Sequence, residues 1–244
     1  MIDLHSHILP GLDDGALDMA ETLSLLRIAS DSGITHMMCT PHIQLGRFDN
    51  NLAKISNAFE QVTKHLESSD IGIKLAFAAE VRICPEIMLM AKQSTLPFIG
   101  TWQGKNVLLL ELPHSHIPAG TEQLIKWLKN NNIMPMIAHP ERNRDILADR
   151  KKLQQLTKLD CLFQLTASSI CGDFGEDARA IALEMIANEQ ATIIATDTHN
   201  VKRRPPKLKD AKDIVTEQFS EKLAQQLVHD IPWRISADKF SVVS

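Results

Sequence analysis

Histidine and carboxylate side chains follow almost every short apolar segment of this chain, and this regularity constrains the fold more than any other feature. The first such segment, residues 1–4, leads directly into His5-Ser6-His7, and the last, residues 191–195, is followed by Asp197 and His199. In a parallel α/β barrel, the residues that follow the strands gather on one face. The sequence therefore predicts one polar site assembled from residues that are far apart in the chain.

Short β-forming segments alternate with longer amphipathic segments along the whole sequence. The apolar segments predict strands at residues 1–4, 35–40, 74–79, 107–112, 134–138, 161–166 and 191–195. Helices are predicted between them, at residues 18–32, 51–68, 121–130, 151–158 and 176–189. Such alternation predicts parallel βαβ units in an α/β fold, which can close into a barrel or remain an open doubly wound sheet.

The chain shows no sign of division into several domains. No linker rich in proline, glycine or serine and no internal repeat is present, so we expect a single domain over residues 1–244.

In the first predicted helix, Asp18 and Glu21 resemble a capping box and Gly33 provides a C-terminal stop. Residues 201–206 are predicted as a basic loop and 208–229 as a final outer helix, so that 208–244 form a C-terminal helix and tail.

The charge balance limits the classes of partner. The 244 residues include 26 Lys and Arg against 30 Asp and Glu, which gives a formal net charge of −4. Binding to nucleic acid or to an anionic membrane needs clustered positive charge, so neither is expected. No apolar run approaches the roughly 18 residues of a membrane helix, and the N-terminus does not resemble a signal peptide. We therefore expect a cytoplasmic protein without direct membrane insertion.

Several common catalytic motifs are absent from the sequence. There is no G-x-G-x-x-G or P-loop for nucleotide phosphates, no G-x-S-x-G nucleophile and no H-E-x-x-H zinc motif. The cysteines lack C-x-x-C spacing, which favours reduced, buried thiols. Cysteine phosphatases need an arginine six positions after the thiolate, and no cysteine here has one, so that mechanism is excluded. The cysteines are Cys39, Cys84, Cys161 and Cys171.

The side chains that follow the predicted strands are nitrogen and oxygen donors without cysteine. Such donors suit manganese, iron or zinc ions. A pair of histidines at a strand end can direct both imidazoles at one cation, and a carboxylate such as Glu80 can bridge two cations. These candidate ligands provide enough donors for two or three ions. The candidates are His5, His7, Asp13 and Asp14, His42, Glu80, Glu111, His139, Asp197 and His199.

The remaining histidines are expected outside the ligand set. His36 lies inside a predicted strand, whereas His65 and His229 lie on predicted helices, where packing or surface positions are the simpler interpretation. His114 and His116 form another histidine pair, but in a loop beyond Glu111. We expect this pair outside the metal site, with a role in a substrate loop as the alternative.

Six motifs carry a resemblance to a known family. MIDLHSHILPGLDDGA, CTPH, AAEV, LLLEL, AHPERN and ATDTHN, in this order, resemble the polymerase and histidinol phosphatase (PHP) superfamily. They are most similar to the bacterial manganese-dependent protein-tyrosine phosphatases of capsule and exopolysaccharide biosynthesis. This resemblance extends to about residue 206 and implies a distorted (β/α)7 TIM-like barrel with a trinuclear metal centre. The ligands it implies are His5, His7, Asp14, His42, Glu80, Glu111, His139, Asp197 and His199.

Two arginines complete the resemblance. Arg142 belongs to the His-Pro-Glu-Arg motif, and Arg204 stands in the loop after Asp-Thr-His. A guanidinium can hold two phosphoryl oxygens through paired hydrogen bonds, which lysine cannot do. We expect both arginines to contact phosphate, although Arg203 is adjacent to Arg204 and is an alternative to it.

The resemblance implies hydrolysis of a phosphotyrosine ester, with the phosphotyrosine-containing tail of a capsule-type tyrosine kinase as substrate. In the mechanism that we hypothesise, metal-activated hydroxide attacks phosphorus and no cysteine phosphoenzyme forms. Arg142 and Arg204 stabilise the phosphoryl oxygens, and Asp197 or His199 supplies a proton. The alternatives are a histidinol-phosphate-type phosphatase, a phosphodiesterase or exonuclease, and a non-catalytic metal-binding regulatory module. An oligomer is compatible with the sequence, which does not specify the oligomeric state.

Overall fold

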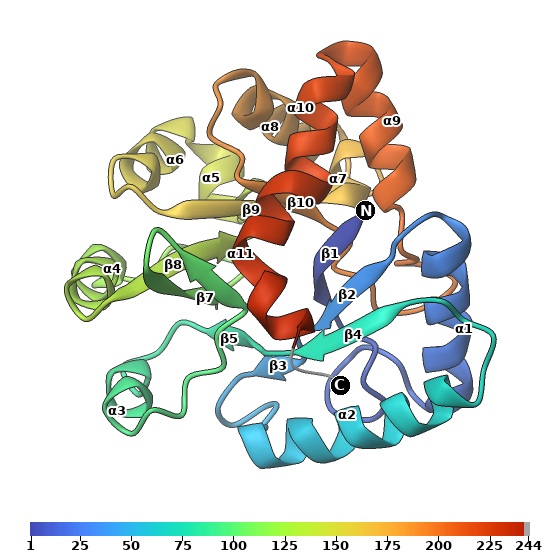
Figure 1. The fold of residues 1–244 in the computed structure, drawn as a ribbon. Helices are drawn as coiled ribbons and strands as arrows, with labels where there is room; N and C mark the ends of the chain where they lie inside the picture. Colours follow the sequence, from blue (N-terminus) through green and yellow to red (C-terminus); the bar gives the residue numbers. More distant parts are fainter. Residues whose placement is uncertain (242–244) are drawn as a thin grey trace.

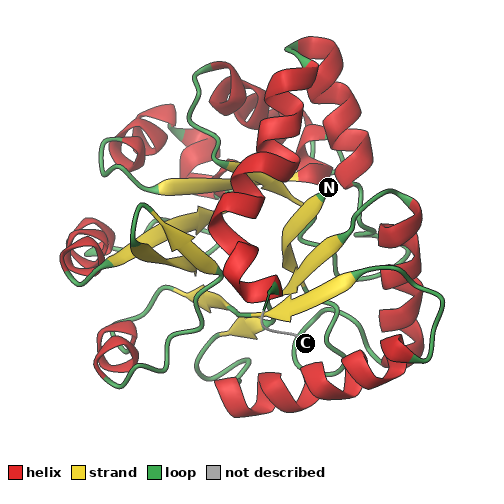
Figure 2. Cartoon of the chain, viewed as in Figure 1, coloured by secondary structure: helices red, strands yellow, loops and turns green. Residues whose placement is uncertain are grey.

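Parallel strands form the centre of the molecule, and helices surround them (Figures 1 and 2). The structure is a computed structural model, and it describes residues 1–241. Every strand predicted from the sequence is present. The strands are β1 (Ile2–Ser6), β2 (His36–Cys39), β3 (His42–Ile43), β4 (Lys74–Phe77), β5 (Glu80–Arg82), β6 (Gly100–Trp102), β7 (Lys105–Glu111), β8 (Ile133–Ala138), β9 (Leu162–Thr166) and β10 (Ile193–Ala195).

The strands form two sheets instead of one continuous barrel wall. One sheet has the order β1-β2-β4, and the other has the order β10-β9-β8-β7-β5-β3, with the antiparallel β6 added to β7. The sheets meet where Ser6 bridges to Thr198 and where the amide of Asp197 donates to the carbonyl of His5 at 2.8 Å. The strand order lacks the reversal of a doubly wound sheet. The predicted α/β fold is thus confirmed as a distorted barrel.

Two short strands account for the break in the wall. The chain leaves β2 at Thr40-Pro41 and resumes as β3, and it leaves β4 at Ala78-Ala79 and resumes as β5. As a result, β2 and β4 belong to one sheet, whereas β3 and β5 belong to the other. These strands have 2 and 3 residues, too few to produce a hydrophobic period, so the sequence did not predict them.

The helices confirm each segment that was predicted between the strands. The side chain of Asp18 accepts a hydrogen bond from the amide of Glu21 at 2.9 Å, and Gly33 follows the C-cap with a φ of +91°. Both ends of the first helix are therefore as predicted. The helices are α1 (Met19–Asp31), α2 (Leu52–Glu67), α3 (Ile87–Lys92), α4 (Thr121–Asn130), α5 (Arg144–Ala148), α6 (Arg150–Thr157), α7 (Ala167–Ile170), α8 (Glu176–Ala187), α9 (Leu208–Gln218), α10 (Glu221–Gln225) and α11 (Ile231–Phe240), with a 3-10 turn at Pro140–Arg142 and a π turn at Gln226–Asp230.

The prediction of one final helix over residues 208–229 was wrong. α9 ends at Gln218, and Ser220 begins α10 by accepting a hydrogen bond from the amide of Leu223 at 3.1 Å. This N-cap starts a new helix that continues through the π turn into α11. The predicted tail therefore includes a further helix as far as Phe240, and residues 242–244 of the expected domain lie outside the described residues.

The helix α11 closes the end of the barrel at which the strands begin (Figure 1). Trp233 and Phe240 pack edge-on against His36, the first residue of β2, with ring centroids 5.2 and 5.0 Å apart. Ile235 belongs to the same apolar cluster as Leu4 inside the barrel. The opposite end of the barrel is left for the polar residues that follow the strands. Within residues 1–241, no helix combines the length and the apolar character that crossing a membrane requires.

Candidate metal centre

Every side chain predicted as a metal ligand lies at the carboxyl ends of the strands or just beyond them. Most belong to the short strands β3 and β5, to the ends of β1 and β7, or to the first residues after β1, β8 and β10. The nine that the resemblance implies form four overlapping groups, and within each group one donor atom per residue lies within 4.8 Å of the others. The groups are His7-Asp14-His42-His199, His5-His7-Glu80, His5-His139-Asp197 and His42-Glu80-Glu111.

The side chains of His5, in β1, and His7, directly after it, point at the same place. Their Nε2 atoms are 3.1 Å apart, and both rings are fully buried. Oε2 of Glu80 lies 3.3 Å from Nε2 of His5 and 3.4 Å from Nε2 of His7, and Oδ1 of Asp197 lies 3.4 Å from each. Two nitrogen and two carboxylate oxygen donors thus surround one point, which is the donor set that a divalent cation takes.

Glu80 lies at the centre of the cluster and is fully buried. Its Oε1 is 2.8 Å from Nε2 of His139, and its Oε2 is 2.8 Å from Nδ1 of His42. Despite this short separation, Oε2 of Glu80 and Nδ1 of His42 are buried and make no hydrogen bond within the described chain. Buried polar atoms are rarely left unpaired. A cation coordinated by both atoms would give each of them a partner, so the residues present fit a bound metal.

The outer edge of the cluster is open to solvent at Asp14. Its side chain is 46% exposed, and Oδ1 lies 3.4 Å from Nε2 of His42 and 3.6 Å from Nε2 of His199. Hydrogen bonds from these two histidines hold the pKa of Asp14 well below its usual range. This edge is therefore where a substrate can reach the buried donors from solvent.

The pKa values of the site reflect burial and crowding of like charges. Burial, with Arg142 nearby, lowers the pKa of His139 to about 4, and burial next to His7 lowers the pKa of His199 to about 4. A neutral imidazole has a lone pair available for a metal. Burial together with the charge of Glu80 raises the pKa of Glu111 to about 7. Bound cations would relieve this repulsion between carboxylates.

Asp13 supports the ligand set from behind, although the resemblance assigned only its neighbour Asp14. The Nδ1 of His7 donates to Oδ2 of Asp13 at 2.7 Å, and the amide of His42 donates to the same oxygen at 2.9 Å. This contact turns Nε2 of His7 toward the cluster. The loop that carries Asp13 packs tightly against His7 at Gly15, where a Cβ would lie 2.0 Å from the carbonyl oxygen of His7.

Two further supporting residues were missed in the sequence. Oε1 of Gln164 lies 2.9 Å from Nδ1 of His5 and 3.3 Å from the amide of His139. Arg82 donates to both oxygens of Glu111 at 2.8 Å. In the sequence, Gln164 could have been noticed as a polar residue within an apolar strand, and Arg82 as a charged residue two positions after Glu80. Contacts of this kind fix the orientation of the residues that bind a metal.

Both predicted phosphate-binding arginines reach the cluster. Arg142, from the turn after β8, and Arg204, from the loop after β10, each donate to Oδ2 of Asp197. The ring of Phe174 lies against both, with its centroid 4.4 Å from the guanidinium carbon of Arg142 and 5.8 Å from that of Arg204. Arg203 is exposed. The structure therefore directs Arg204, and not Arg203, toward the cluster.

The other histidines stand outside the four groups. His36 packs against α11, and His65 lies on α2. His114 and His116 are exposed in the loop after β7, where His114 lines a pocket beside Arg142. The residues outside the groups are His36, His65, His114, His116 and His229.

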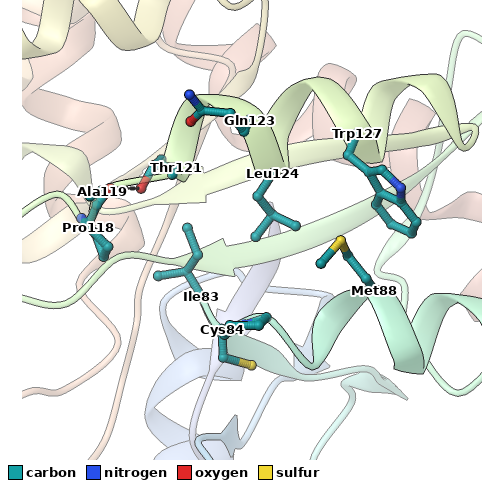
Figure 3. Close-up of a pocket in the computed structure, with 11 residues that line it drawn as sticks. Ile83, Cys84, Met88, Pro118, Ala119, Thr121, Gln123, Leu124 and Trp127 are labelled. Carbon is teal, nitrogen blue, oxygen red and sulfur yellow. Dashed lines mark hydrogen bonds between the residues drawn. The ribbon is translucent and has the colours of Figure 1, made fainter.

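An apolar groove lies between α3 and α4, away from the cluster (Figure 3). The side chains of Met88, Leu124 and Trp127 face one another across it, and Ile83 lies further along the same groove. None of its lining residues is charged. A phosphate group has no charged partner there, so the charged part of a substrate belongs at the polar cluster.

Comparisons with known proteins agree with the geometry of the cluster. The family described as capsular polysaccharide synthesis, CpsB/CapC, matches residues 1–236. The tyrosine-protein phosphatase YwqE of Bacillus subtilis is 34% identical over 231 residues, covering 94% of this chain and 89% of that protein. Crystal structures of YwqE and of CpsB from Streptococcus pneumoniae are described as unique metal-dependent tyrosine phosphatases. One such chain matches with a TM-score of 0.88 and 32% identity, covering 96% of this chain and 93% of that chain.

A more distant match concerns the fold alone. The lactonase Lmo2620 from Listeria monocytogenes matches with a TM-score of 0.56 and 15% identity, covering 96% of this chain and 94% of that chain. The arrangement of strands and helices is thus shared by proteins of different chemistry, and the function has to be inferred from the site.

Proposed function

We propose that this chain, which belongs to the CpsB/CapC family of capsular polysaccharide synthesis, is a metal-dependent protein-tyrosine phosphatase. Membership of this family agrees with the motif resemblance to capsule-associated tyrosine phosphatases. The observation that carries the proposal is the meeting of two arginines with a buried cluster of histidines and carboxylates. Metal donors next to a guanidinium pair are suited to a phosphate ester.

The metal centre would hold two or three ions, with manganese as the expected metal and iron and zinc as alternatives. The four overlapping groups and their nitrogen and oxygen donors support this number and this choice. When bound, such ions supply positive charge to the phosphoryl group and lower the pKa of water in the site. The ligands would be His5, His7, Asp14, His42, Glu80, Glu111, His139, Asp197 and His199.

The catalytic residues would be Arg142, Arg204, Asp197 and His199. The arginines bind and orient the phosphoryl oxygens, and Phe174 limits the directions in which their guanidinium groups can turn. Asp197 or His199 gives a proton to the leaving oxygen. A phenol has a pKa of about 10, so its oxygen needs less help from an acid than an alkoxide does. This favours an aryl phosphate over an alkyl phosphate as the substrate.

The substrate would be phosphotyrosine in another protein, and we propose the tail of a capsule-type tyrosine kinase. The names of the relatives and the description of the family support a phosphoprotein of capsule biosynthesis. The chain itself contains 0 Tyr, so the phosphotyrosine has to come from a different protein.

Hydrolysis of an aryl phosphate and of a phosphotyrosyl peptide tests the proposal. We expect activity to be lost on chelation and restored by manganese, with elemental analysis to count the ions. Activity that survives verified metal removal would contradict the mechanism. Faster turnover of histidinol phosphate than of phosphotyrosyl peptide would favour the small-molecule alternative. A His199→Ala variant that keeps full partner function without turnover would favour the regulatory module.

A further inference from the structure

A pocket lined by both basic and apolar side chains opens beside the proposed phosphate position. It has a volume of about 400 Å³, within the range of pockets that bind small ligands or parts of larger ones. Arg142 lines this pocket and also contacts Asp197 in the metal cluster, so the pocket and the cluster adjoin. The lining residues are His114, Arg142, Arg144, Leu147, Phe174 and Ala178. They include two arginines and a histidine but no carboxylate.

The two arginines of this pocket differ in their partners, because Arg142 is paired with Asp197 whereas Arg144 has no carboxylate partner within the described residues. Arg144 is exposed and forms no ion pair within the described chain, whereas Arg150 pairs with Glu184 and Lys152 with Asp145. The nearby carboxylate of Asp145 is taken by Lys152 at 2.8 Å and by the amide of Ile117 at 3.0 Å. The guanidinium of Arg144 is therefore free to bind an anion from solvent.

The loop opposite Arg144 is held in place by hydrogen bonds. The amide of Arg144 donates to the carbonyl of His114 at 2.9 Å. The side chain of Asn143 donates to the carbonyls of Pro113 and His116 at 2.8 and 3.2 Å. Partial burial, together with the positive charges of Arg142, Arg144 and Arg82, lowers the pKa of His114, as expected where positive potential accumulates. The pocket is thus formed before any substrate arrives.

We propose that this pocket is a substrate subsite for an anionic group on a residue close to the phosphotyrosine. The anionic group is either a carboxylate or a second phosphoryl group, since a guanidinium binds both. Leu147, Phe174 and Ala178 provide apolar contact for the carbon atoms that carry it. This inference rests on the proposed function, because it needs a phosphotyrosine held at Arg142. His114, which lies outside the four metal groups, would be part of the wall of this subsite.

Phosphotyrosyl peptides with different neighbours test this subsite. One peptide carries glutamate next to the phosphotyrosine, one carries a second phosphotyrosine, and one carries only alanine, with a small aryl phosphate as reference. We expect kcat/KM for the two anionic peptides to exceed that for the alanine peptide. In Arg144→Ala, the ratio of kcat/KM for an anionic peptide to that for the aryl phosphate should fall roughly tenfold, mainly through KM.

The matched control is Arg150→Ala, which removes a surface arginine paired with Glu184 outside the pocket. It should leave that ratio unchanged. Equal loss on all substrates in Arg144→Ala, or no preference of the unmodified protein for anionic peptides, would overturn the proposal. The better of the two anionic peptides identifies the source of the anion.

Failure of the subsite and failure of the proposed function give different results. If the metal-loaded protein does not hydrolyse even the aryl phosphate, the phosphatase proposal is wrong. Calorimetric titration with non-hydrolysable phosphonate versions of the same peptides then tests the subsite without turnover. Binding that is equally tight for the anionic and alanine phosphonates would contradict the subsite.

Discussion

The guanidinium groups of Arg142 and Arg204 meet at one atom, Oδ2 of Asp197. The first arginine comes from the turn after β8 and the second from the loop after β10, so loops that follow the strands on either side of β9 are joined through one carboxylate. The other oxygen of Asp197 faces His5, in β1, and His7, directly after it. A single residue therefore links the predicted metal ligands to the predicted phosphate contacts.

Replacement of either arginine by lysine tests this arrangement. We expect Arg142→Lys and Arg204→Lys each to lower kcat/KM for an aryl phosphate by about 10- to 100-fold, because a hydrogen bond to a charged group contributes about 1.5–3 kcal/mol and lysine cannot donate two in parallel. Arg203→Lys serves as the control, because Arg203 is exposed. A larger loss in Arg203→Lys than in Arg204→Lys would contradict the assignment.

We predict that Glu141 is a positioning residue for its neighbour Arg142. Its buried Oε1 accepts hydrogen bonds from the amide of Thr166 at 2.9 Å and from the hydroxyl of Ser169 at 2.7 Å, which anchors the turn that carries Arg142. We expect Glu141→Ala to destabilise the fold by about 1–3 kcal/mol and to raise KM for an aryl phosphate. Glu141→Gln keeps an oxygen acceptor and should restore most of both. An equal KM in the alanine and glutamine variants would refute the positioning role.

Metal binding should stabilise the folded protein. Carboxylates such as Glu80 and Glu111 repel one another in the buried cluster, and a bound cation removes this repulsion. At a free metal concentration about 100 times Kd, the free energy of unfolding should rise by about 2.7 kcal/mol, or roughly 5–11 °C in melting temperature for a chain of this size. Scanning calorimetry with manganese and with chelator measures this. Glu80→Gln should show a smaller rise, and an unchanged rise would place the metal elsewhere.

Much of the site could be predicted because each candidate ligand follows a strand, and the barrel converts that position into proximity. The same rule could not supply Gln164 or Arg82, because a polar residue in or after a strand does not reveal which ligand it supports. The left-handed backbone of His139 and Asp197, with φ of 33° and 51°, also has no sequence signal, since neither residue is glycine.

The fold could be predicted where a periodic hydrophobic pattern extends over many residues. The prediction failed where the element is too short to show such a pattern. The helix at residues 121–130 was predicted with the bounds that α4 has. By contrast, β3 and β5 depend on partners in the second sheet and not on their own composition. The C-terminal helices were merged in the prediction because no glycine or proline separates α9 from α10, and the break at Phe219 depends on the N-cap formed by Ser220.

The thiols should be unreactive at neutral pH. Burial raises the pKa of Cys161 to about 12 and, with Asp210 nearby, that of Cys171 to about 11. A pKa of 11 leaves roughly 0.1% thiolate at pH 8, so alkylation of Cys171 by iodoacetamide should be roughly 100-fold slower than that of a free cysteine and should accelerate about tenfold per pH unit up to pH 10. Mass spectrometry measures the rates. Phosphatase activity that disappears in step with alkylation would argue for a thiol nucleophile.

Closure of the barrel by α11 depends on the absence of a side chain at Gly100. A Cβ on this residue would lie 1.8 Å from the carbonyl oxygen of Ile235, so Gly100→Ala should push α11 away from the strands. We expect a loss of roughly 3 kcal/mol or more in the free energy of unfolding, because a backbone carbonyl cannot move aside as a side chain can. Urea denaturation followed by circular dichroism measures the loss.

The matched control for this change is Gly104→Ala, in the same hairpin. Gly104 has a φ of +77°, but a Cβ there would meet nothing within 4 Å. It should therefore cost only the backbone strain of a left-handed residue, about 1–2 kcal/mol. Because α11 lies at the end of the barrel opposite the metal cluster, Gly100→Ala should lower the free energy of unfolding. The kcat/KM of the protein that remains folded should stay close to that of the unmodified protein. Equal destabilisation by the two substitutions would show that the carbonyl of Ile235 does not prevent a side chain at position 100.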